Sequence, residues 1–261
     1  MRKTGWMNAL LLVAVFCPLS FAEEWNKTYS ISGKADLRVD VDDGGITVRA
    51  WDRNEISARI ITHGWKIGPE VRVNEQQSGD RVTLEVRTPR VHFSTGHRSL
   101  RLELQVPREL RTEIHSGDGG ISVNGLKGEI HLSSGDGAIE AESLEGLLQA
   151  KTGDGHIRAS GRWDRLDLET NDGSIEADVS TGSKMAASWR VRTGDGHVTL
   201  RLPQDFSADL DARTGDGRIT VDFPVTVSGS LRTSEFRGKI NSGGEPLVVQ
   251  TGDGAIHIQP H

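Results

Sequence analysis

A four-residue motif, Ser/Thr-Gly-Asp-Gly, recurs through the C-terminal part of the chain and constrains its fold more than any other feature. One of its seven copies has Asn171 in place of the first glycine. The central aspartates are separated by 18, 18, 18, 23, 21 and 37 residues, and they are Asp118, Asp136, Asp154, Asp172, Asp195, Asp216 and Asp253. Recurrence at this spacing indicates a repeat architecture in which each repeat is one structural unit.

Apolar and polar residues alternate on both sides of each turn. Ile130 and Leu132 precede one turn, and Ile139 and Ala141 follow it. A period of two over three to five residues predicts short strands with one buried face. By the same alternation the Ser or Thr of the motif points inward. The residue before it points outward, as at Lys151, Glu169 and Arg192.

Strands this short must stack coil upon coil to bury their inner faces. We therefore predict an all-β fold, a parallel β-solenoid (β-helix-like) with repeats of about 18–23 residues. Each coil has two strands that flank the turn and a third short side near Leu126, Leu144 and Trp163. An antiparallel meander of hairpins is the alternative, because Asp-Gly is also a hairpin signal. The near-constant spacing favours stacking.

Two further segments extend the repeat, and the chain divides into three parts. The 37-residue gap holds a degenerate copy, Thr233–Ile240, and Asp43-Gly44-Gly45-Ile46 is an outlying copy near the N-terminus. We expect a signal peptide at 1–22, less regular β coils that act as a cap at 23–110, and regular repeats at 111–261. Because solenoid ends need covering, residues 23–261 are expected to form one continuous domain.

The first 22 residues have the features of a secretory signal peptide. Arg2 and Lys3 precede the apolar run Ala9–Phe16, and Ser20-Phe21-Ala22 provides a small-x-small cleavage site. The run is too short to span a membrane comfortably, and an uncleaved anchor is the alternative. Cys17, the sole cysteine, lies inside this segment. We therefore expect an exported mature chain, periplasmic or at the cell surface, without a disulfide or a transmembrane segment.

The glycines of the motif are expected to have different roles. The position before Asp holds Gly or Asn171, the residues that best tolerate positive φ, so we predict a left-handed backbone there. The Gly after Asp is the same in all seven copies, which indicates a close approach of two backbones. The hydroxyl and the carboxylate are both able to bond turn amides. The motif is therefore interpreted first as a self-capping structural turn.

Stacking would place the seven aspartates in a row, about 5 Å apart. Two carboxylates at this distance repel by about 1 kcal/mol in water. His156, His197 and Arg218, each directly after a turn, are candidates to offset this repulsion. Calcium is another, because it binds several oxygen ligands, although the nonapeptide calcium-binding repeat is absent. We predict no cofactor and treat the row as the one candidate for a weak calcium site.

Charge and motifs narrow the classes of function. The chain has 31 Lys and Arg against 37 Asp and Glu, a net charge of −6, so a nucleic-acid partner is not expected. The cations from Arg87 through Arg101 are interpreted as a solvated face. No His-Glu-x-x-His or Gly-x-Ser-x-Gly motif occurs, and we assign no catalytic residue. The long repeat around Thr181–Met185 lacks a nucleophile–base pair and is interpreted as a bulged loop.

The chain resembles the bacterial "putative adhesin" family of exported β-strand-repeat domains of unknown function. The resemblance covers residues 30 to 258 and is carried by Ser/Thr-Gly-Asp-Gly-x-Ile and by Gly45-Ile-Thr-Val48-Arg-Ala-Trp51-Asp. The resemblance extends to two places where a proline directly follows a predicted strand, Val106-Pro107 and Leu202-Pro203. The resemblance implies a β-helix-like fold and an envelope or surface location, and it brings no catalytic residues.

Together these features predict a non-enzymatic, exported β-solenoid, an adhesin-like binding or scaffold module of the cell envelope. Its partner would be an envelope or surface protein or a polysaccharide. Two other hypotheses stay open: a carbohydrate-active enzyme built on a β-helix, and a protein that senses envelope stress. The first predicts turnover of polysaccharides and the second a dedicated protein partner.

Overall fold

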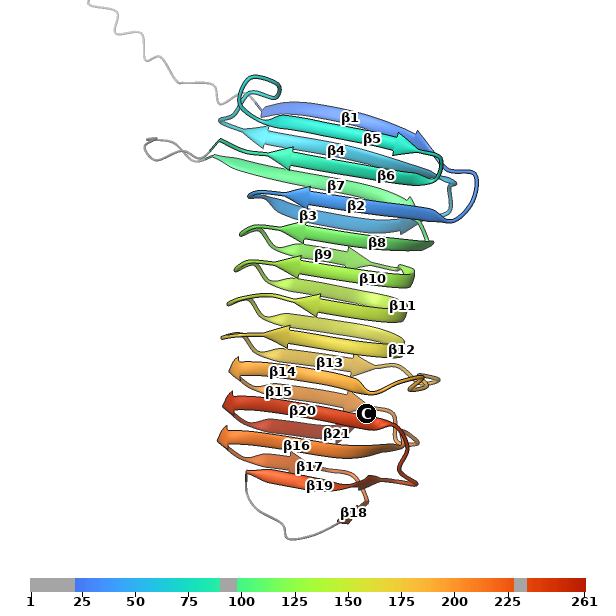
Figure 1. Cartoon of the computed structure of the whole chain (residues 1–261), viewed down its shortest axis with the longest axis vertical. Coiled ribbons are helices and arrows are strands. Elements are labelled where there is room, and N and C mark those ends of the chain that lie inside the picture. The colour runs from blue at the N-terminus through green and yellow to red at the C-terminus, as the bar shows by residue number, and fades with distance from the viewer. Residues whose placement is uncertain (1–21, 90–97, 228–233) are drawn as a thin grey trace, which may run out of the picture.

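A computed structural model describes residues 22–89, 98–227 and 234–261. The predicted signal peptide, apart from Ala22, and Cys17 lie outside the described residues. Every regular element within them is a β-strand, so the all-β prediction is confirmed. The strands join into one mixed sheet that winds into an elongated stack (Figure 1). The described residues contain no helix of the length and hydrophobicity that crossing a membrane requires.

The middle of the chain consists of coils stacked in parallel. One face holds the strands before each turn and the other holds those after it. The strands are β8 (Glu109–Ser116), β9 (Ile121–Asn124), β10 (Lys127–Ser134), β11 (Ile139–Lys151) and β12 (Ile157–Thr170). Strand β10 pairs in parallel with β8 and β11, and β11 pairs in parallel with β12, so the predicted stacking holds here. Strands β11 and β12 run through both faces and bend at the corner opposite the turn.

The C-terminal coils do not stack in the order of the sequence. Their strands are β13 (Ile175–Val179), β14 (Trp189–Asp195), β15 (Val198–Leu202), β16 (Ala208–Asp216), β17 (Ile219–Val221), β20 (Pro246–Asp253) and β21 (Ile256–Pro260). The last coil, β20 and β21, lies between β14/β15 and β16/β17, as Figure 1 shows. Thr251 is thus paired with Thr193 on one side and Thr214 on the other.

The N-terminal coils are also out of sequence order. Strands β2 (Ala35–Val41) and β3 (Gly45–Trp51) form a coil that lies between two later ones. One neighbour is β6 (Arg81–Arg87) with β7 (Ser99–Pro107), and the other is β8 with β9. The outlying copy at Asp43-Gly44-Gly45 is therefore a true member of the stack, directly beside the turn of Asp118.

Antiparallel strands lie at both ends, so the prediction of a wholly parallel β-solenoid is correct only in part. They are β1 (Ala22–Ser30), β4 (Glu55–His63), β5 (Arg72–Ser78), β18 (Val225–Val227) and β19 (Glu235–Ile240). The interpretation of Thr233–Ile240 as a degenerate coil is wrong in its described part, because β19 runs antiparallel to β16. This segment lacks the Gly-Asp-Gly sequence that the parallel turns share.

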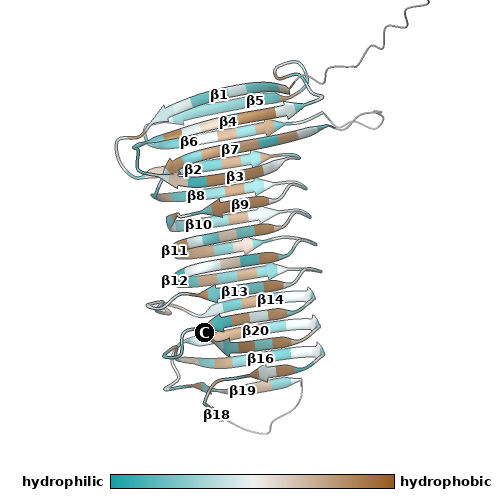
Figure 2. Cartoon of the chain, turned by 180° about the vertical axis from the view of Figure 1, so that it is seen from behind, coloured by the Kyte–Doolittle hydropathy of each residue, from teal (hydrophilic) through white to brown (hydrophobic). Residues whose placement is uncertain are grey.

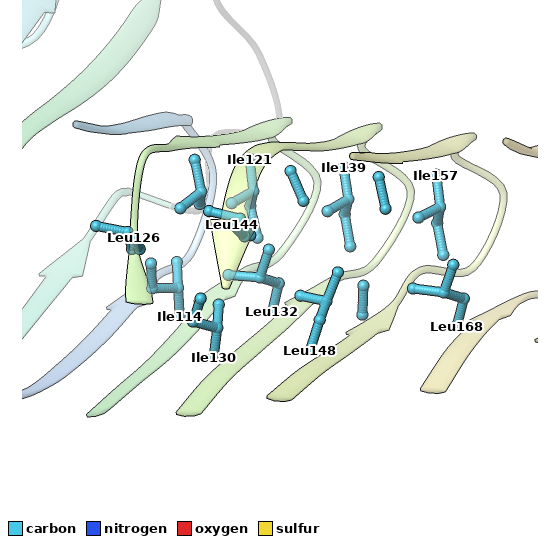
Figure 3. Close-up of a cluster of buried hydrophobic side chains, with 14 of the residues drawn as sticks. Ile114, Ile121, Leu126, Ile130, Leu132, Ile139, Leu144, Leu148, Ile157 and Leu168 are labelled. Carbon is cyan, nitrogen blue, oxygen red and sulfur yellow. The ribbon is translucent and has the colours of Figure 1, made fainter. Parts of the chain in front are cut away.

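The core is a thin column of aliphatic side chains between the two faces. Ile139 lies beside Ile121 and Ile157 in neighbouring coils, and all three are buried (Figure 3). Apolar and polar residues alternate along the strands in Figure 2. The predicted third side is buried as well, at Leu126, Leu144 and Trp163. Full burial of one such aliphatic side chain stabilises the fold by about 1.5–3 kcal/mol.

The turn glycines allow the backbones of neighbouring coils to touch. A Cβ on Gly155 would collide with the carbonyl oxygen of Gly137, and one on Gly137 with that of Gly119. The predicted close approach at the second glycine is therefore confirmed. The predicted left-handed backbone before Asp is wrong, because neither Asn171 nor any glycine at that position has positive φ. Those glycines, like Gly153, also lie against a backbone carbonyl of the next coil.

Replacing Gly155 by Ala is expected to destabilise the protein by about 1–3 kcal/mol, since the new methyl group must displace the backbone of a neighbouring coil. Gly45→Ala is the control, because the nearest atom to its Cβ would be the carbonyl oxygen of Gly120 at 4.0 Å. Chemical denaturation of both variants measures the difference. Equal stability of the two variants would contradict the role assigned to the close approach.

Candidate functional site

A ladder of hydroxyl groups runs up the inside of the turn edge. The hydroxyl of each motif donates to the carbonyl oxygen of the second motif glycine in a neighbouring coil. The hydroxyl–carbonyl pairs are Ser116–Gly44, Ser134–Gly119, Thr152–Gly137, Thr170–Gly155, Thr193–Gly173, Thr251–Gly196 and Thr214–Gly254, at 2.8–3.0 Å. The last two pairs follow the spatial order of the coils and not the order of the sequence.

Several hydroxyls of this ladder also cap their own turn. The oxygen of Ser134 accepts a hydrogen bond from the amide of Gly137, and that of Thr170 accepts one from Gly173. Both side chains are buried. One hydroxyl therefore satisfies two backbone groups, one in its own coil and one in the next. The predicted inward direction and the capping role of the hydroxyl are both confirmed.

The seven predicted aspartates lie outside this ladder, along one exposed edge of the stack. They are Asp118, Asp136, Asp154, Asp172, Asp195, Asp216 and Asp253, and all are exposed. In the part of the chain that the structure describes, none of their carboxylates takes part in a side-chain hydrogen bond or an ion pair. His156, His197 and Arg218 form no ion pair with them there. The carboxylate thus does not join the hydroxyl in capping the turn.

One arginine lies beside the N-terminal end of this edge and pairs with two aspartates that precede the outlying turn. Arg87 Nη1 lies 2.8 Å from Asp40 Oδ1 and 2.8 Å from Asp42 Oδ1. Its hydrogen bond holds the pKa of the Asp40 carboxyl below the ordinary value. Asp42 directly precedes the outlying copy of the turn, so this cation sits where the row begins.

The residues brought together along the edge are acidic but do not converge. Within residues 22–89, 98–227 and 234–261, no three His, Cys, Asp or Glu side chains gather closely enough to hold a metal ion. Each aspartate projects from a separate coil, so the row is linear. The calcium hypothesis remains a prediction to be tested.

The two outer faces carry aligned charges that are mostly paired with charges on neighbouring coils. Arg158 lies between Glu140 and Glu176, at 4.0 and 3.8 Å. The predicted outward ladder is present, since Lys151 Nζ lies 2.6 Å from Glu169 Oε2. Exposed pairs of this kind each stabilise by less than about 1 kcal/mol. Their regular spacing makes each face a flat, rigid array of alternating charge.

The long repeat closes over the corner opposite the turns. Residues 180–188 form an irregular loop, as predicted, and Ser183 Oγ accepts a hydrogen bond from the backbone amide of Trp163 at 3.0 Å. The amide of Lys184 donates to the carbonyl oxygen of Trp163. The loop therefore replaces a strand that would otherwise cover Trp163, which is fully buried.

A hollow that the sequence did not reveal lies on the outer face near the N-terminal end. Its volume is about 470 Å³, and three arginines line it: Arg49, Arg59 and Arg101. Glu103 and Gln105 of β7 lie between them. The arginines come from the consecutive strands β3 and β4 and from β7, which is distant from both in sequence. The pairing of these strands brings the three arginines together. Of the predicted solvated face from Arg87 to Arg101, only Arg101 lines the hollow, and residues 90–97 lie outside the described ones.

Comparison with known proteins supports the fold. The family model described as Toastrack DUF4097 matches two overlapping segments, residues 27–185 and 164–259. No curated protein matches the chain. A crystal structure described as a putative adhesin from Bacteroides fragilis is 10% identical, with a TM-score of 0.50, over 92% of this chain and 97% of that one.

Two further crystal structures align over most of the chain. A putative cell adhesion protein from Clostridium sporogenes is 16% identical, with a TM-score of 0.48, over 92% of this chain and 100% of that chain. A putative lipid binding protein from Parabacteroides distasonis is 13% identical, with a TM-score of 0.41, over 91% of this chain and 96% of that one.

Thr170→Val is expected to destabilise the protein by about 1–3 kcal/mol, because it leaves the buried carbonyl of Gly155 and the amide of Gly173 without a side-chain partner. Asp172→Asn in the same turn is the matched control and is expected to leave stability unchanged. Chemical denaturation distinguishes the two. A larger loss from Asp172→Asn than from Thr170→Val would show that the carboxylate, and not the hydroxyl, holds the turn.

The melting temperature is expected to be the same in Ca²⁺ and in chelator, because the aspartates form a row and not a cluster. Differential scanning calorimetry of the unaltered chain and of Asp154→Asn measures this directly. A melting temperature that rises with Ca²⁺ in the unaltered chain but not in the variant would instead assign a calcium site to the turn edge.

Proposed function

The chain belongs to the Toastrack DUF4097 family, and from this premise we propose that it is a non-enzymatic, exported binding or scaffold module of the cell envelope. The observation that carries the proposal is the outer surface of the stack. Side chains there lie in straight rows across neighbouring coils, as in the row Glu140, Arg158, Glu176. Their backbones are fixed by the in-register pairing of the coils.

A rigid array suits recognition of an extended partner. Because the coils repeat at the spacing of paired strands, about 4.8 Å, equivalent side chains recur at that interval along the stack. A partner with its own repeating groups, such as a polysaccharide or a strand of an envelope protein, would find several equivalent contacts. Little conformational entropy is lost when the binding surface is already ordered, which favours affinity.

The proposal includes export and the architecture that goes with it. The sequence from Arg2 to Ala22 has the pattern of a cleaved signal peptide, and the mature part of the chain contains no cysteine. A β-solenoid-like stack held by backbone pairing and by buried hydroxyls needs no disulfide. We place the protein in the periplasm or at the cell surface. The adhesion-related names of the structural neighbours are consistent with such a location.

Export is tested by N-terminal sequencing of the protein recovered from a fractionated cell that expresses the full chain. The sequence is expected to begin at Glu23, and the protein is expected in the envelope or secreted fraction. A chain that retains Met1 and stays in the cytosolic fraction would contradict the proposed location.

Binding is tested with the chain from Glu23 to His261 immobilised as bait against envelope extracts. We expect a retained polysaccharide or protein that elutes as salt is raised, because the faces present alternating charge. Arg158→Gln combined with Arg201→Gln is the matched variant, and it should weaken retention if the middle of the face takes part. Release of reducing sugar ends by the pure chain from the retained polysaccharide would contradict the non-enzymatic assignment.

A further inference from the structure

We propose that the hollow lined by Arg49, Arg59 and Arg101 binds an acidic saccharide with more than one carboxylate, one held by the Arg49 guanidinium group and another by that of Arg101. The proposal rests on the function proposed above and names a ligand class for one site on the face. The hollow has a volume of about 470 Å³, which falls in the range of small-molecule sites.

Strand pairing fixes the positions around the hollow. On β7, Arg101, Glu103 and Gln105 point outward in succession. Arg59 of β4 lies beside Glu103, and Arg49 of β3 lies beside Gln105. Glu103 therefore lies between Arg101 and Gln105 on its own strand, with Arg59 beside it on β4 and Thr47 beside it on β3. Asn26, Thr47 and Ser57 complete the polar lining.

One of the three arginines is already neutralised. Arg59 Nη2 lies 2.7 Å from Glu24 Oε1, and Arg59 Nη1 lies 3.7 Å from Glu103 Oε2. The hydrogen bond from Arg59 holds the pKa of the Glu24 carboxyl below the ordinary value. Arg59 is thus held in place as one wall of the hollow, and its positive charge is compensated by Glu24 and Glu103.

The other two arginines have neutral neighbours. Arg49 lies between Gln105 and Asn124, and Arg101 lies between Ile61 and Gly45. No described carboxylate lies within 4.0 Å of either guanidinium, and the segments that the structure does not describe contain no Asp or Glu. Arginines elsewhere on this face, such as Arg158 between two glutamates, are paired. Two uncompensated cations at one hollow favour an anionic ligand.

The space beside Arg101 exists because its neighbour on β3 has no side chain. Gly45 is opposite Arg101, and the nearest atom that a Cβ there would meet is the carbonyl oxygen of Gly120, at 4.0 Å. A carboxylate is able to enter this space and accept two parallel hydrogen bonds from the Arg101 guanidinium group. This bidentate geometry is the strongest form of an arginine–carboxylate pair.

The lining favours an acidic saccharide over a simple anion. The Glu103 carboxylate, which lines the hollow, accepts hydrogen bonds from sugar hydroxyls, and a phosphate or a sulfate has few or no such donors to offer. The amides of Asn26 and Gln105 both donate and accept, as hydroxyl groups do. A ligand with two or more carboxylates and several hydroxyls uses both cations and the acceptor between them.

Isothermal titration calorimetry of the chain from Glu23 to His261 with trigalacturonate tests the proposal. We expect binding that Arg49→Gln combined with Arg101→Gln weakens about tenfold or more, because two charge-assisted contacts are lost. The control is Arg190→Gln combined with Arg213→Gln, which removes the same charge from paired positions of the opposite face, on β14 and β16, and should leave the affinity unchanged. Circular dichroism confirms that all variants are folded.

The proposal would be overturned by no binding of trigalacturonate, by equal binding of its methyl ester, or by inorganic phosphate binding as tightly as trigalacturonate. An affinity unaffected by the change at Arg49 and Arg101 would also overturn it. The envelope retention experiment separates this site from the wider function. If envelope material is still retained while trigalacturonate does not bind, the proposed binding module stands and this ligand does not.

Discussion

The structure depends on the contact between the backbones of neighbouring coils at the turn. Glycine allows two chains to approach until no Cβ fits, and the buried hydroxyl of each motif then bonds the glycine carbonyl of the next coil. Without the glycines, neighbouring coils would lie farther apart and the hydroxyls would not reach the carbonyl oxygens of the next coil. Without the hydroxyls, buried carbonyl and amide groups would lose a partner, which is costly in an apolar interior. The glycine contacts and the hydroxyl hydrogen bonds together cover the aliphatic core at this edge.

This interaction is the same in all seven copies of the motif, and that sameness explains the unusual order of the stack. Any turn of this type fits against any other, so the motif does not dictate which coil is the neighbour of which. The last coil in sequence lies inside the stack, and the outermost positions are taken by antiparallel strands such as β1 and β18. Irregular strands at the ends of a sheet hinder further addition of strands, which protects an exported protein from association.

The sequence predicts what alternation and repetition determine. The strands, the inward hydroxyls and the close approach at the second glycine all follow from period-two patterning and from comparison of the seven copies. The order of the coils does not follow, because identical motifs carry no information about which copy is adjacent. Residue type alone predicts a left-handed backbone for the glycine before Asp, but its φ is not positive. Its contact with a backbone carbonyl of the neighbouring coil explains why a glycine is needed there. The arginine hollow depends on pairing between distant strands, which no local pattern reveals.

The order of the coils is the most direct consequence of this account, and engineered disulfides measure it. Gln250 lies between Arg192 and Arg213 on adjacent outward positions. With Cys17 replaced by Ser, a cysteine at position 250 should form a disulfide on oxidation with one at 192 and, in a second variant, with one at 213, since paired strands bring their Cα atoms within the required range. Cysteines at 192 and 213 together should stay reduced. A disulfide between 192 and 213, and none with 250, would show that the coils follow the sequence and would contradict the account.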